Sequence, residues 1–364
     1  MSLILFIEEF EMPGTAVSAT KEELLRYFRE MYTMRRMEIT CDTEYKARNI
    51  RGFCHLYDGQ EAIAMGVRAA LSDEDSLITS YRCHGMAYLY GSTVEQVLAE
   101  LFGYSQGSSK GKGGSMHFYS KKDNFYGGQG IVGAQVPCGA GLAFAAKYNT
   151  PDGEKMPIAV AFYGDGAANQ GQVWESANMS KLWNLPMVFA IENNHFGMGT
   201  QTHRSSCNEL YYTMGGRTIP GLRINGMNVL AVKKGFEVIR EFCSSGNGPL
   251  FVELDTYRYH GHSMSDPGTT YRTREEVGSI RQARDPIEYV KKLLIENKLC
   301  TEDELKQVEK EQRNHVQESL ARAKAGKLPP SEWVYDEIYA TPEGKDEPQR
   351  FVRMPDYKKS VVRA

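Results

Sequence analysis

The fold class is decided by Ala159-Val-Ala-Phe-Tyr-Gly164-Asp165-Gly166-Ala167-Ala168-Asn169. In this stretch an apolar run ends in a carboxylate between two glycines, and a helical pattern begins directly after it at Gln172–Leu182. That order is typical of a buried strand that leads through a tight turn into a helix. Ligands of open α/β sheets bind at the carboxyl ends of the strands. The stretch therefore predicts a parallel sheet with a ligand-binding edge beside Asp165.

Strand-like and helical patterns alternate on both sides of this stretch. Apolar runs typical of buried strands lie at Leu77–Thr79, Ile158–Tyr163, Met187–Glu192 and Leu250–Leu254. Helical patterns lie at Val94–Phe102, Ala140–Tyr148, Gln172–Leu182 and Val229–Cys243. Strands that alternate with helices form a parallel sheet whose two faces are both covered. The sequence therefore predicts an α/β fold with helices on both faces of the sheet.

The two ends of the chain differ from this central pattern. Residues 1–19 are irregular, and Thr20 with Glu23 predicts a capping box for a helix that runs to about Met37. We expect the α/β domain to span residues 20–285, with a polar surface loop at His260–Arg274. A C-terminal extension, residues 286–364, then begins with charged amphipathic helices near Ile287–Glu296 and Glu302–Ala325 and ends in a Pro-rich tail.

The composition narrows the class of function. The chain has 364 residues, 41% of them hydrophobic and 24% charged, with a net charge of −3, so it can bury a core and has no strong field of one sign. We expect neither nucleic acid nor membrane as a partner. Seven cysteines without a C-x-x-C pair argue against a disulfide framework and against structural zinc, and favour a reducing compartment. The acidic residues that follow Met1–Ile7 do not resemble an Arg-rich transit peptide.

A second polar group follows the next predicted strand, which ends in Glu192-Asn193-Asn194. Asp165 and Asn194 would then lie at the ends of neighbouring strands, close enough to share one Mg²⁺ through oxygen ligands, with the carbonyl of Phe196 as a third ligand. Either motif alone is more simply explained as a turn. Two of them at strand ends that one helix separates favour a metal and phosphate site, because the helix N-terminus also offers free N–H groups.

At these residues the chain resembles a known family. Gly164-Asp165-Gly166 through Asn193-Asn194 is similar to the thiamine diphosphate motif. Four further strings resemble alpha subunits of the 2-oxo acid dehydrogenases, and among these the pyruvate-decarboxylating kind: Arg51-Gly-Phe-Cys-His-Leu56, Lys112-Gly-Gly-Ser-Met-His117, Gly130-Ile-Val-Gly-Ala-Gln135 and Tyr259-His-Gly-His-Ser-Met-Ser-Asp-Pro267. The resemblance covers about Thr20 to Asp285 and fades in both tails.

The resemblance implies a set of site residues. Tyr81 and Arg82 would contact the diphosphate, and Gly130 and Val132 would present backbone groups to the aminopyrimidine. His262 and His55 would be the acid/base groups, because imidazoles titrate near neutrality. The remaining cofactor-binding residues implied are Asp165, Gly166, Ala167, Asn194 and His262, with Asp165, Asn194 and Phe196 as metal ligands.

The resemblance also implies an activity and partners. The reaction would be thiamine diphosphate- and Mg²⁺-dependent decarboxylation of pyruvate, followed by transfer of the two-carbon fragment to a lipoyl group on an acyltransferase, in the mitochondrial matrix. One domain that grips the diphosphate leaves few residues to grip the pyrimidine, so we expect a beta subunit and an α2β2 heterotetramer. Ser263 and Thr270 match phosphorylation sites of a regulatory kinase and phosphatase, whereas Gln201 replaces a third serine.

Two glycine-rich segments suggest other nucleotide sites. Gly128-Gln-Gly130-Ile-Val-Gly133 fits the dinucleotide pattern G-x-G-x-x-G, but the polar residues Lys121–Asn124 argue against the strand that should precede it. Gly107-Ser-Ser-Lys-Gly-Lys112 is too short between its glycines for a phosphate-binding P-loop. We interpret it as a mobile connection beside the site.

Three alternatives remain open at this point. A branched-chain 2-oxo acid dehydrogenase alpha subunit would resemble GEG in place of the GDG around Asp165, and would lack the His-Leu that begins at His55. A non-catalytic regulatory paralogue would be expected to lose Asp165, Asn194 or His262, all of which are present. An NAD-dependent dehydrogenase is disfavoured, because polar residues rather than an apolar strand pattern precede the glycines of Gly128–Gly133.

Overall fold

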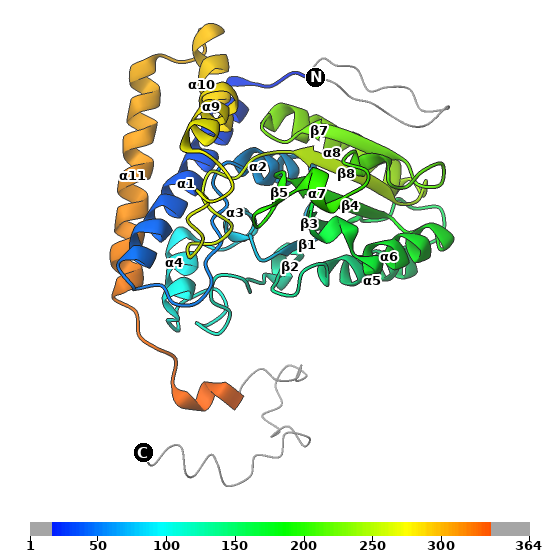
Figure 1. Ribbon diagram of the computed structural model, residues 1–364, viewed down its shortest axis with the longest axis horizontal. Helices are drawn as coiled ribbons and strands as arrows, with labels where there is room; N and C mark the ends of the chain where they lie inside the picture. Colours follow the sequence, from blue (N-terminus) through cyan, green and yellow to red (C-terminus); the bar gives the residue numbers. More distant parts are fainter. Residues whose placement is uncertain (1–16, 336–364) are drawn as a thin grey trace.

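A computed structural model of the chain describes residues 17–335 (Figure 1). Its centre is a six-stranded parallel sheet with the order β2-β1-β3-β4-β8-β7. The strands are β1 (Ser76–Ser80), β2 (Phe125–Gln129), β3 (Ala159–Gly164), β4 (Met187–Asn193), β7 (Gly221–Asn225) and β8 (Leu250–Asp255). A small antiparallel pair, β5 (Phe196–Gly197) and β6 (Thr200–Gln201), follows β4.

Helices cover both faces of this sheet, as the sequence predicts. Alternate residues of β3 point to opposite sides: Val160 and Phe162 pack in one buried cluster, and Ala159, Ala161 and Tyr163 pack in another. The first cluster includes residues of α2 (Glu61–Ala70) and α8 (Val229–Ser244), and the second includes residues of α5 (Gln135–Asn149) and α6 (Gly171–Leu182). The α/β fold with helices on both faces is therefore confirmed.

Further helices extend the first cluster outward (Figure 1). They are α1 (Lys21–Lys46), α3 (His84–Leu89), α4 (Val94–Phe102), α10 (Pro286–Glu296) and α11 (Glu302–Lys324), and α9 (Arg274–Arg284) precedes α10. The capping box at Thr20 and Glu23 is confirmed. Because α10 and α11 share the buried cluster of α1, the division of the chain at residue 285 stays a prediction. Most of the predicted N-terminal segment and of the predicted tail lies outside residues 17–335.

Several elements were missed from sequence. The strands β2 and β7 lie at the two edges of the sheet, where partial exposure allows glycines and polar residues that hide a strand pattern. In the helix α2 all residues from Glu61 to Val67 are buried, a glutamate and a glycine among them, and α9 has no buried residue at all.

The expectation that no strand leads into Gly128–Gly133 was wrong. The strand β2 ends at Gln129 and includes Gly128, and α5 follows the last of these glycines. However, β2 is an edge strand, whereas the dinucleotide fingerprint follows the first strand of the Rossmann fold, which lies in the middle of the sheet. The topology therefore excludes that site on other grounds.

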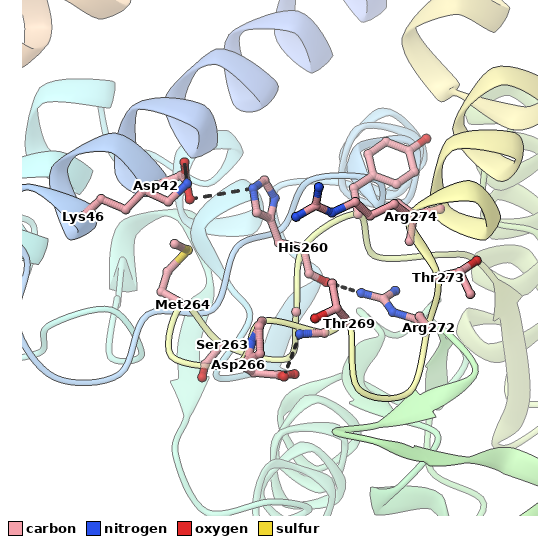
Figure 2. A pocket seen from close by; sticks show the side chains of 15 residues that line it. Asp42, Lys46, His260, Ser263, Met264, Asp266, Thr269, Arg272, Thr273 and Arg274 are labelled. Atoms are coloured by element: carbon pink, nitrogen blue, oxygen red, sulfur yellow. Dashed lines mark hydrogen bonds and ion pairs between the residues drawn. The ribbon is translucent and has the colours of Figure 1, made fainter.

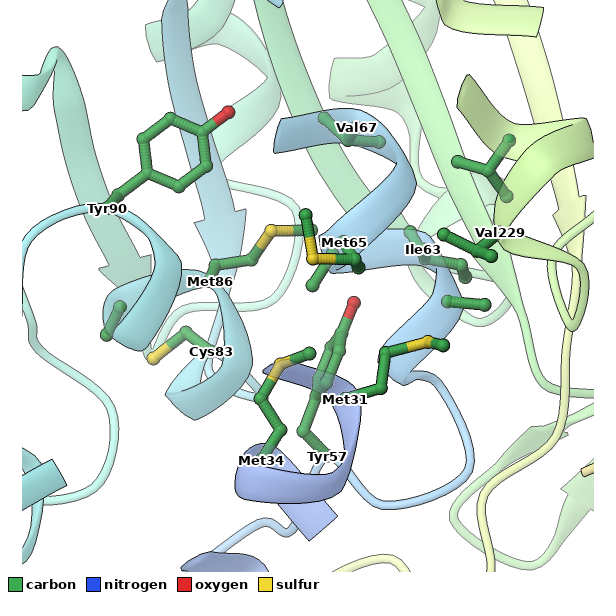
Figure 3. Packing of buried hydrophobic residues seen from close by; sticks show 14 of the residues in the cluster. Met31, Met34, Tyr57, Ile63, Met65, Val67, Cys83, Met86, Tyr90 and Val229 are labelled. Atoms are coloured by element: carbon green, nitrogen blue, oxygen red, sulfur yellow. The ribbon is translucent and has the colours of Figure 1, made fainter. Parts of the chain in front are cut away.

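Methionines fill the space between α1, α2 and α3 (Figure 3). Met31 and Met34 of α1, Met65 of α2 and Met86 of α3 surround Tyr57, which is fully buried. Unbranched thioether side chains suit an irregular gap around an aromatic ring. At the far end of that ring the Tyr57 hydroxyl donates a hydrogen bond of 2.7 Å to the buried carboxylate of Glu192, so this core reaches the carboxyl end of β4.

No helix within residues 17–335 is long and apolar enough to cross a lipid bilayer.

We predict that Tyr57→Phe lowers the free energy of unfolding by about 1–3 kcal/mol at pH 8, because it removes a donor from a buried carboxylate. Urea titration followed by circular dichroism would measure the change. Tyr148→Phe is the matched control, since Tyr148 is 81% exposed. Equal stabilities of the two variants would contradict a role for the Tyr57 hydroxyl in the core.

Candidate cofactor site

One cavity of about 230 Å³ opens at the carboxyl ends of the central strands. Most of the residues named from sequence line it: Tyr81, Arg82, Val132, Asp165, Gly166, Ala167, Asn194, Phe196 and His262. Gly130 follows directly after β2, two residues before Val132. The centroid of the His55 ring lies 4.4 Å from that of Tyr81 and 5.3 Å from that of His262. The predicted residues from five separate segments therefore meet around a single space.

Three residues with candidate metal-binding oxygens, Asp165, Asn194 and Phe196, line the cavity at the ends of β3 and β4. These strands pair in parallel with Gly164 opposite Glu192, so Asp165 and Asn194 follow neighbouring strand ends as expected. Asp165 is buried, its Oδ2 has no hydrogen-bond partner among residues 17–335, and burial raises its pKa to about 6. An ionisable oxygen that is buried and unpaired is costly unless something binds it.

A protein cation already lies against two of these donors. The guanidinium Nη1 of Arg258 donates to the carbonyl oxygen of Phe196 at 2.6 Å and to Oδ1 of Asn194 at 3.2 Å. Arg258 is only 1% exposed, so its charge is buried, and the hydrogen bonds to these oxygens offset part of the cost of desolvation. The donor set, with a carboxylate, an amide oxygen and a carbonyl, fits a hard divalent cation.

The orientation of the Asn194 amide follows from its neighbours. Gln60 donates from Nε2 to the Glu192 carboxylate at 3.2 Å, which leaves its Oε1 as an acceptor. Asn194 donates from Nδ2 to that oxygen at 3.1 Å. Glu192 accepts from Gln60 and Gln60 accepts from Asn194, so this series fixes which way both amides point. The oxygen of Asn194 is left to accept from Arg258 and, at 3.4 Å, from the backbone N–H of Phe196.

Arg82 joins two of the segments that enclose the cavity. Its guanidinium is buried and donates to the carbonyl of Leu56 at 2.7 Å and to that of His262 at 2.8 Å. The same side chain lines the cavity. A guanidinium held in this way presents its remaining N–H groups in a fixed direction, which suits recognition of a phosphate.

The two candidate acid/base histidines are both neutral at pH 7. Burial, with help from the charge of Arg82, lowers the pKa of His262 to about 4 and that of His55 to about 2. In both rings Nδ1 is buried without a hydrogen-bond partner in the described chain. In a neutral imidazole, such an unpaired ring nitrogen can accept a proton from a bound molecule or form a hydrogen bond with it.

The loop that carries His262 is held by its own side chains and by α1. Asp266 accepts hydrogen bonds from the backbone N–H of His262 and from the Tyr271 hydroxyl, and that hydroxyl in turn accepts from Arg258 at 2.7 Å. Arg272 donates to the carbonyl of His260 at 2.6 Å (Figure 2).

His260 is directed toward α1 (Figure 2). Its Nδ1 lies 2.7 Å from the carboxylate of Asp58 and its Nε2 lies 3.8 Å from that of Asp42, and these partners raise its pKa although burial alone would lower it. The loop is thus held both by hydrogen bonds among its own residues and by the contacts of His260 with Asp58 and Asp42.

The two candidate phosphorylation sites on this loop differ in exposure. Ser263 is only 8% exposed, and its Oγ shares a hydrogen bond of 2.9 Å with Oγ of Ser265. Ser263 is therefore less accessible than the polar composition of its loop suggests, because the loop turns back on itself at Asp266, whose backbone N–H donates to the Ser263 carbonyl. Thr270 is exposed. A second cavity of about 330 Å³ lies beside the loop and is lined partly by Ser263 and Asp266 (Figure 2).

Gln60, Glu192 and Arg258 are site residues that sequence reasoning missed. The sequence places Glu192 at a strand end, directly before the Asn193-Asn194 pair, but its role as an acceptor for Tyr57 and Gln60 was not predicted. Nothing in the patterns around Gln60 or Arg258 indicates their role, because both reach the site from segments distant in sequence.

The chain is similar to known proteins over most of its length. The family model described as dehydrogenase E1 component matches residues 29–332. The chain is 53% identical to a probable pyruvate dehydrogenase E1 component subunit alpha, mitochondrial, of Caenorhabditis elegans, covering 90% of this chain and 81% of the relative. It is 52% identical to a pyruvate dehydrogenase E1 component subunit alpha-2, mitochondrial, of Arabidopsis thaliana (90% and 82%), and 49% identical to the corresponding alpha subunit, mitochondrial, of Dictyostelium discoideum (90% and 85%). The chain therefore belongs to the dehydrogenase E1 component family, whose members depend on thiamine diphosphate.

Proposed function

We propose that this chain is the alpha subunit of the pyruvate-decarboxylating component of a mitochondrial pyruvate dehydrogenase complex. The observation that carries the proposal is the single cavity in which the oxygens of Asp165, Asn194 and Phe196 lie together with the guanidinium of Arg82. The names of its relatives support pyruvate as the substrate and the mitochondrial matrix as the location.

The metal and the diphosphate would share this cavity. Asp165, Asn194 and the Phe196 carbonyl would hold Mg²⁺, and the exposed backbone at Gly166 leaves room for phosphate oxygens beside Ala167. Tyr81 and Arg82 would bind the diphosphate from the opposite wall. Gly130 and Val132 would face the aminopyrimidine. Thiamine diphosphate, when bound, supplies the nucleophilic carbon and the electron sink for decarboxylation, so the protein has to bind, orient and exclude water.

His262 and His55 would handle protons at the substrate. Since both imidazoles are neutral at pH 7, each has a ring nitrogen that could accept a proton and later return it, and an N–H that could donate a hydrogen bond. His262 lines the cavity, whereas His55 is not among its lining residues and packs against Tyr81 and Phe53, so His262 would be the nearer group. The two-carbon fragment would then pass to a lipoyl group carried by the acyltransferase component.

A beta subunit would cover an apolar face that the chain leaves exposed. The face, which we call the α5/α6 face, consists of Ile131, Val132, Cys138, Phe144, Tyr148, Leu182 and Trp183. Tyr148 is 81% exposed, Leu182 74% and Ile131 75%. Phe144 stacks on Tyr148 and meets Trp183 edge-on, with centroids 6.3 and 5.8 Å apart. Contiguous apolar patches of this kind mark protein interaction sites.

The position of the α5/α6 face favours a beta subunit as its occupant. The helix α5 is apolar on its sheet side through Val136 and Ala143 and again on its outer side, which is typical of a helix buried on all sides. The face also runs into Val132, which lines the cofactor cavity. A partner on this face would therefore reach the side of the cofactor that the chain itself does not enclose.

Phosphorylation would act on the loop of His262. A regulatory kinase would modify Ser263 and Thr270, and a phosphatase would reverse it. Phosphate adds a charge of about −1.5 to −2. At Ser263, whose carbonyl accepts a hydrogen bond of 3.0 Å from the backbone of Asp266, that charge would lie against a carboxylate and open the loop.

We predict that Asp165→Asn abolishes Mg²⁺-dependent binding of thiamine diphosphate while the fold survives, because a neutral amide is a far weaker ligand for a hard cation. Calorimetry of the assembled enzyme with cofactor and Mg²⁺ would measure the affinity, which should fall by at least roughly a hundredfold. Wild-type affinity in the variant would show that Asp165 belongs to a structural turn.

A second prediction concerns assembly. Tyr148→Asp and Leu182→Asp should each leave the chain folded but lower its co-purification with a beta subunit, because a charge would be buried at the contact. Leu328→Asp is the control, since Leu328 is 71% exposed and lies outside the α5/α6 face. Undiminished assembly with beta, or loss of alpha–alpha association alone, would argue against this occupant.

We further predict that Ser263→Glu lowers turnover of the complete complex by at least roughly tenfold, because a buried charge beside Asp266 disorders the His262 loop. Ser263→Ala should keep near-normal turnover and resist a kinase specific for this position. Normal activity of the Ser263→Glu variant, together with full activity after stoichiometric phosphorylation, would rule out the switch.

A further inference from the structure

A single carboxylate organises the glycine-rich loop at residues 107–114. Glu100 of α4 is fully buried. Its Oε2 accepts hydrogen bonds from the backbone N–H groups of Ser109 at 2.8 Å and Gly111 at 2.9 Å, and its Oε1 accepts from those of Gly113 at 2.7 Å and Gly114 at 3.2 Å. The loop thus surrounds an anion that belongs to the chain itself.

This arrangement explains the likeness of the segment to a phosphate-binding loop. Consecutive backbone N–H groups that curve around an anion form the same concavity in a P-loop, where a phosphate is bound. Here the concavity is filled by the Glu100 carboxylate, which anchors a loop whose composition suggests a mobile connection. Glycine is required by close approach: a Cβ at Gly107 would lie 2.3 Å from Glu100 Oε2, and one at Gly113 would lie 2.0 Å from the carbonyl oxygen of His117.

The loop continues into residues 115–117 and is hydrogen-bonded to the last of them. Oγ of Ser109 donates to the carbonyl of His117 at 2.6 Å. Nδ1 of His117 lies 3.1 Å from the carbonyl oxygen of Gly128, at the end of β2. The Met116 carbonyl packs against the same glycine so closely that a Cβ at Gly128 would lie 2.2 Å from it.

On their other side, residues 115–117 contact the segment that follows Arg82. Nε2 of His84 lies 2.9 Å from Oγ of Ser115, and Sγ of Cys83 lies 3.5 Å from the carbonyl oxygen of Met116. Residues 115–117 therefore lie between two segments that lead to the cofactor cavity. One carries Tyr81 and Arg82, and the other leads from Gly128 to Gly130 and Val132.

We propose that Glu100 is a positioning residue for cofactor binding: by gathering four backbone N–H groups, its carboxylate sets the distance between the diphosphate wall at Arg82 and the pyrimidine wall at Gly130–Val132. Glu100 does not line the cavity itself and acts through residues 107–117. The inference rests on the proposed function, because it assigns those two walls to the two ends of thiamine diphosphate.

The test is Glu100→Gln in the enzyme assembled with a beta subunit. The amide has nearly the same shape, but its NH₂ group would face N–H donors and leave some of them unpaired. Affinity for thiamine diphosphate with Mg²⁺, measured by calorimetry, should fall by roughly tenfold or more. Hydrogen exchange in peptides covering residues 107–117 should accelerate, while kcat at saturating cofactor stays within about threefold of wild type, since ground-state binding alone is weakened.

Two further variants keep the result interpretable. Glu95→Gln on the same helix is the matched control, because Glu95 only pairs with Arg322 at the surface and should change neither measurement. Ser109→Ala removes the bond to His117 without touching the carboxylate; it should weaken cofactor affinity to a smaller extent, and it remains usable if Glu100→Gln fails to fold.

Unchanged cofactor affinity in Glu100→Gln and Ser109→Ala would overturn the inference, even if both were less stable, since that is the result expected of a purely structural carboxylate. A wild-type enzyme that binds no thiamine diphosphate would instead reject the proposed function. The two failures are therefore distinguishable.

Discussion

The site depends on one electrostatic constraint, the burial of the Asp165 carboxylate beside two neutral oxygens at the end of a parallel sheet. A parallel sheet brings all its carboxyl ends to one edge, so Asp165 and Asn194 meet there although 28 positions of chain and a whole helix separate them. The burial that raises the pKa of Asp165 to about 6 makes the site receptive to a cation, and Arg258 already supplies one charge to the neighbouring oxygens. The rest of the cavity is built to fix these atoms.

Polar groups outside the cavity hold its lining residues in position. The series Tyr57, Glu192, Gln60 and Asn194 runs from the methionine-filled core to a candidate metal ligand, each link being a hydrogen bond of 2.7 to 3.2 Å. Partners of this kind orient the groups that bind a metal and often matter nearly as much as the ligands. Glu100 acts in the same manner on the backbone of a loop. In both cases a buried carboxylate is tolerated because several donors satisfy it.

The sequence was most informative where one physical requirement dominates. The central strands must be apolar on both faces, so β3, β4 and β8 were recognised, and a capping box identified the start of α1. The edge strands β2 and β7 escaped because partial exposure relaxes that requirement. Gln60 and Arg258 escaped because their roles arise from tertiary contacts. The burial of Ser263 could not be predicted, because composition reports polarity, whereas the fold of this loop comes from the tertiary hydrogen bonds of Asp266.

The central claim is that these residues serve pyruvate decarboxylation, and substrate preference tests it most directly. The chain would be co-expressed with a beta subunit, and kcat/KM for pyruvate and for 2-oxoisovalerate would be compared with and without thiamine diphosphate and Mg²⁺. The account predicts activity that requires both cofactors and favours pyruvate by at least roughly tenfold, the scale on which a pocket separates substrates that differ by a few methyl groups. A higher kcat/KM for 2-oxoisovalerate, or activity independent of thiamine diphosphate, would contradict it.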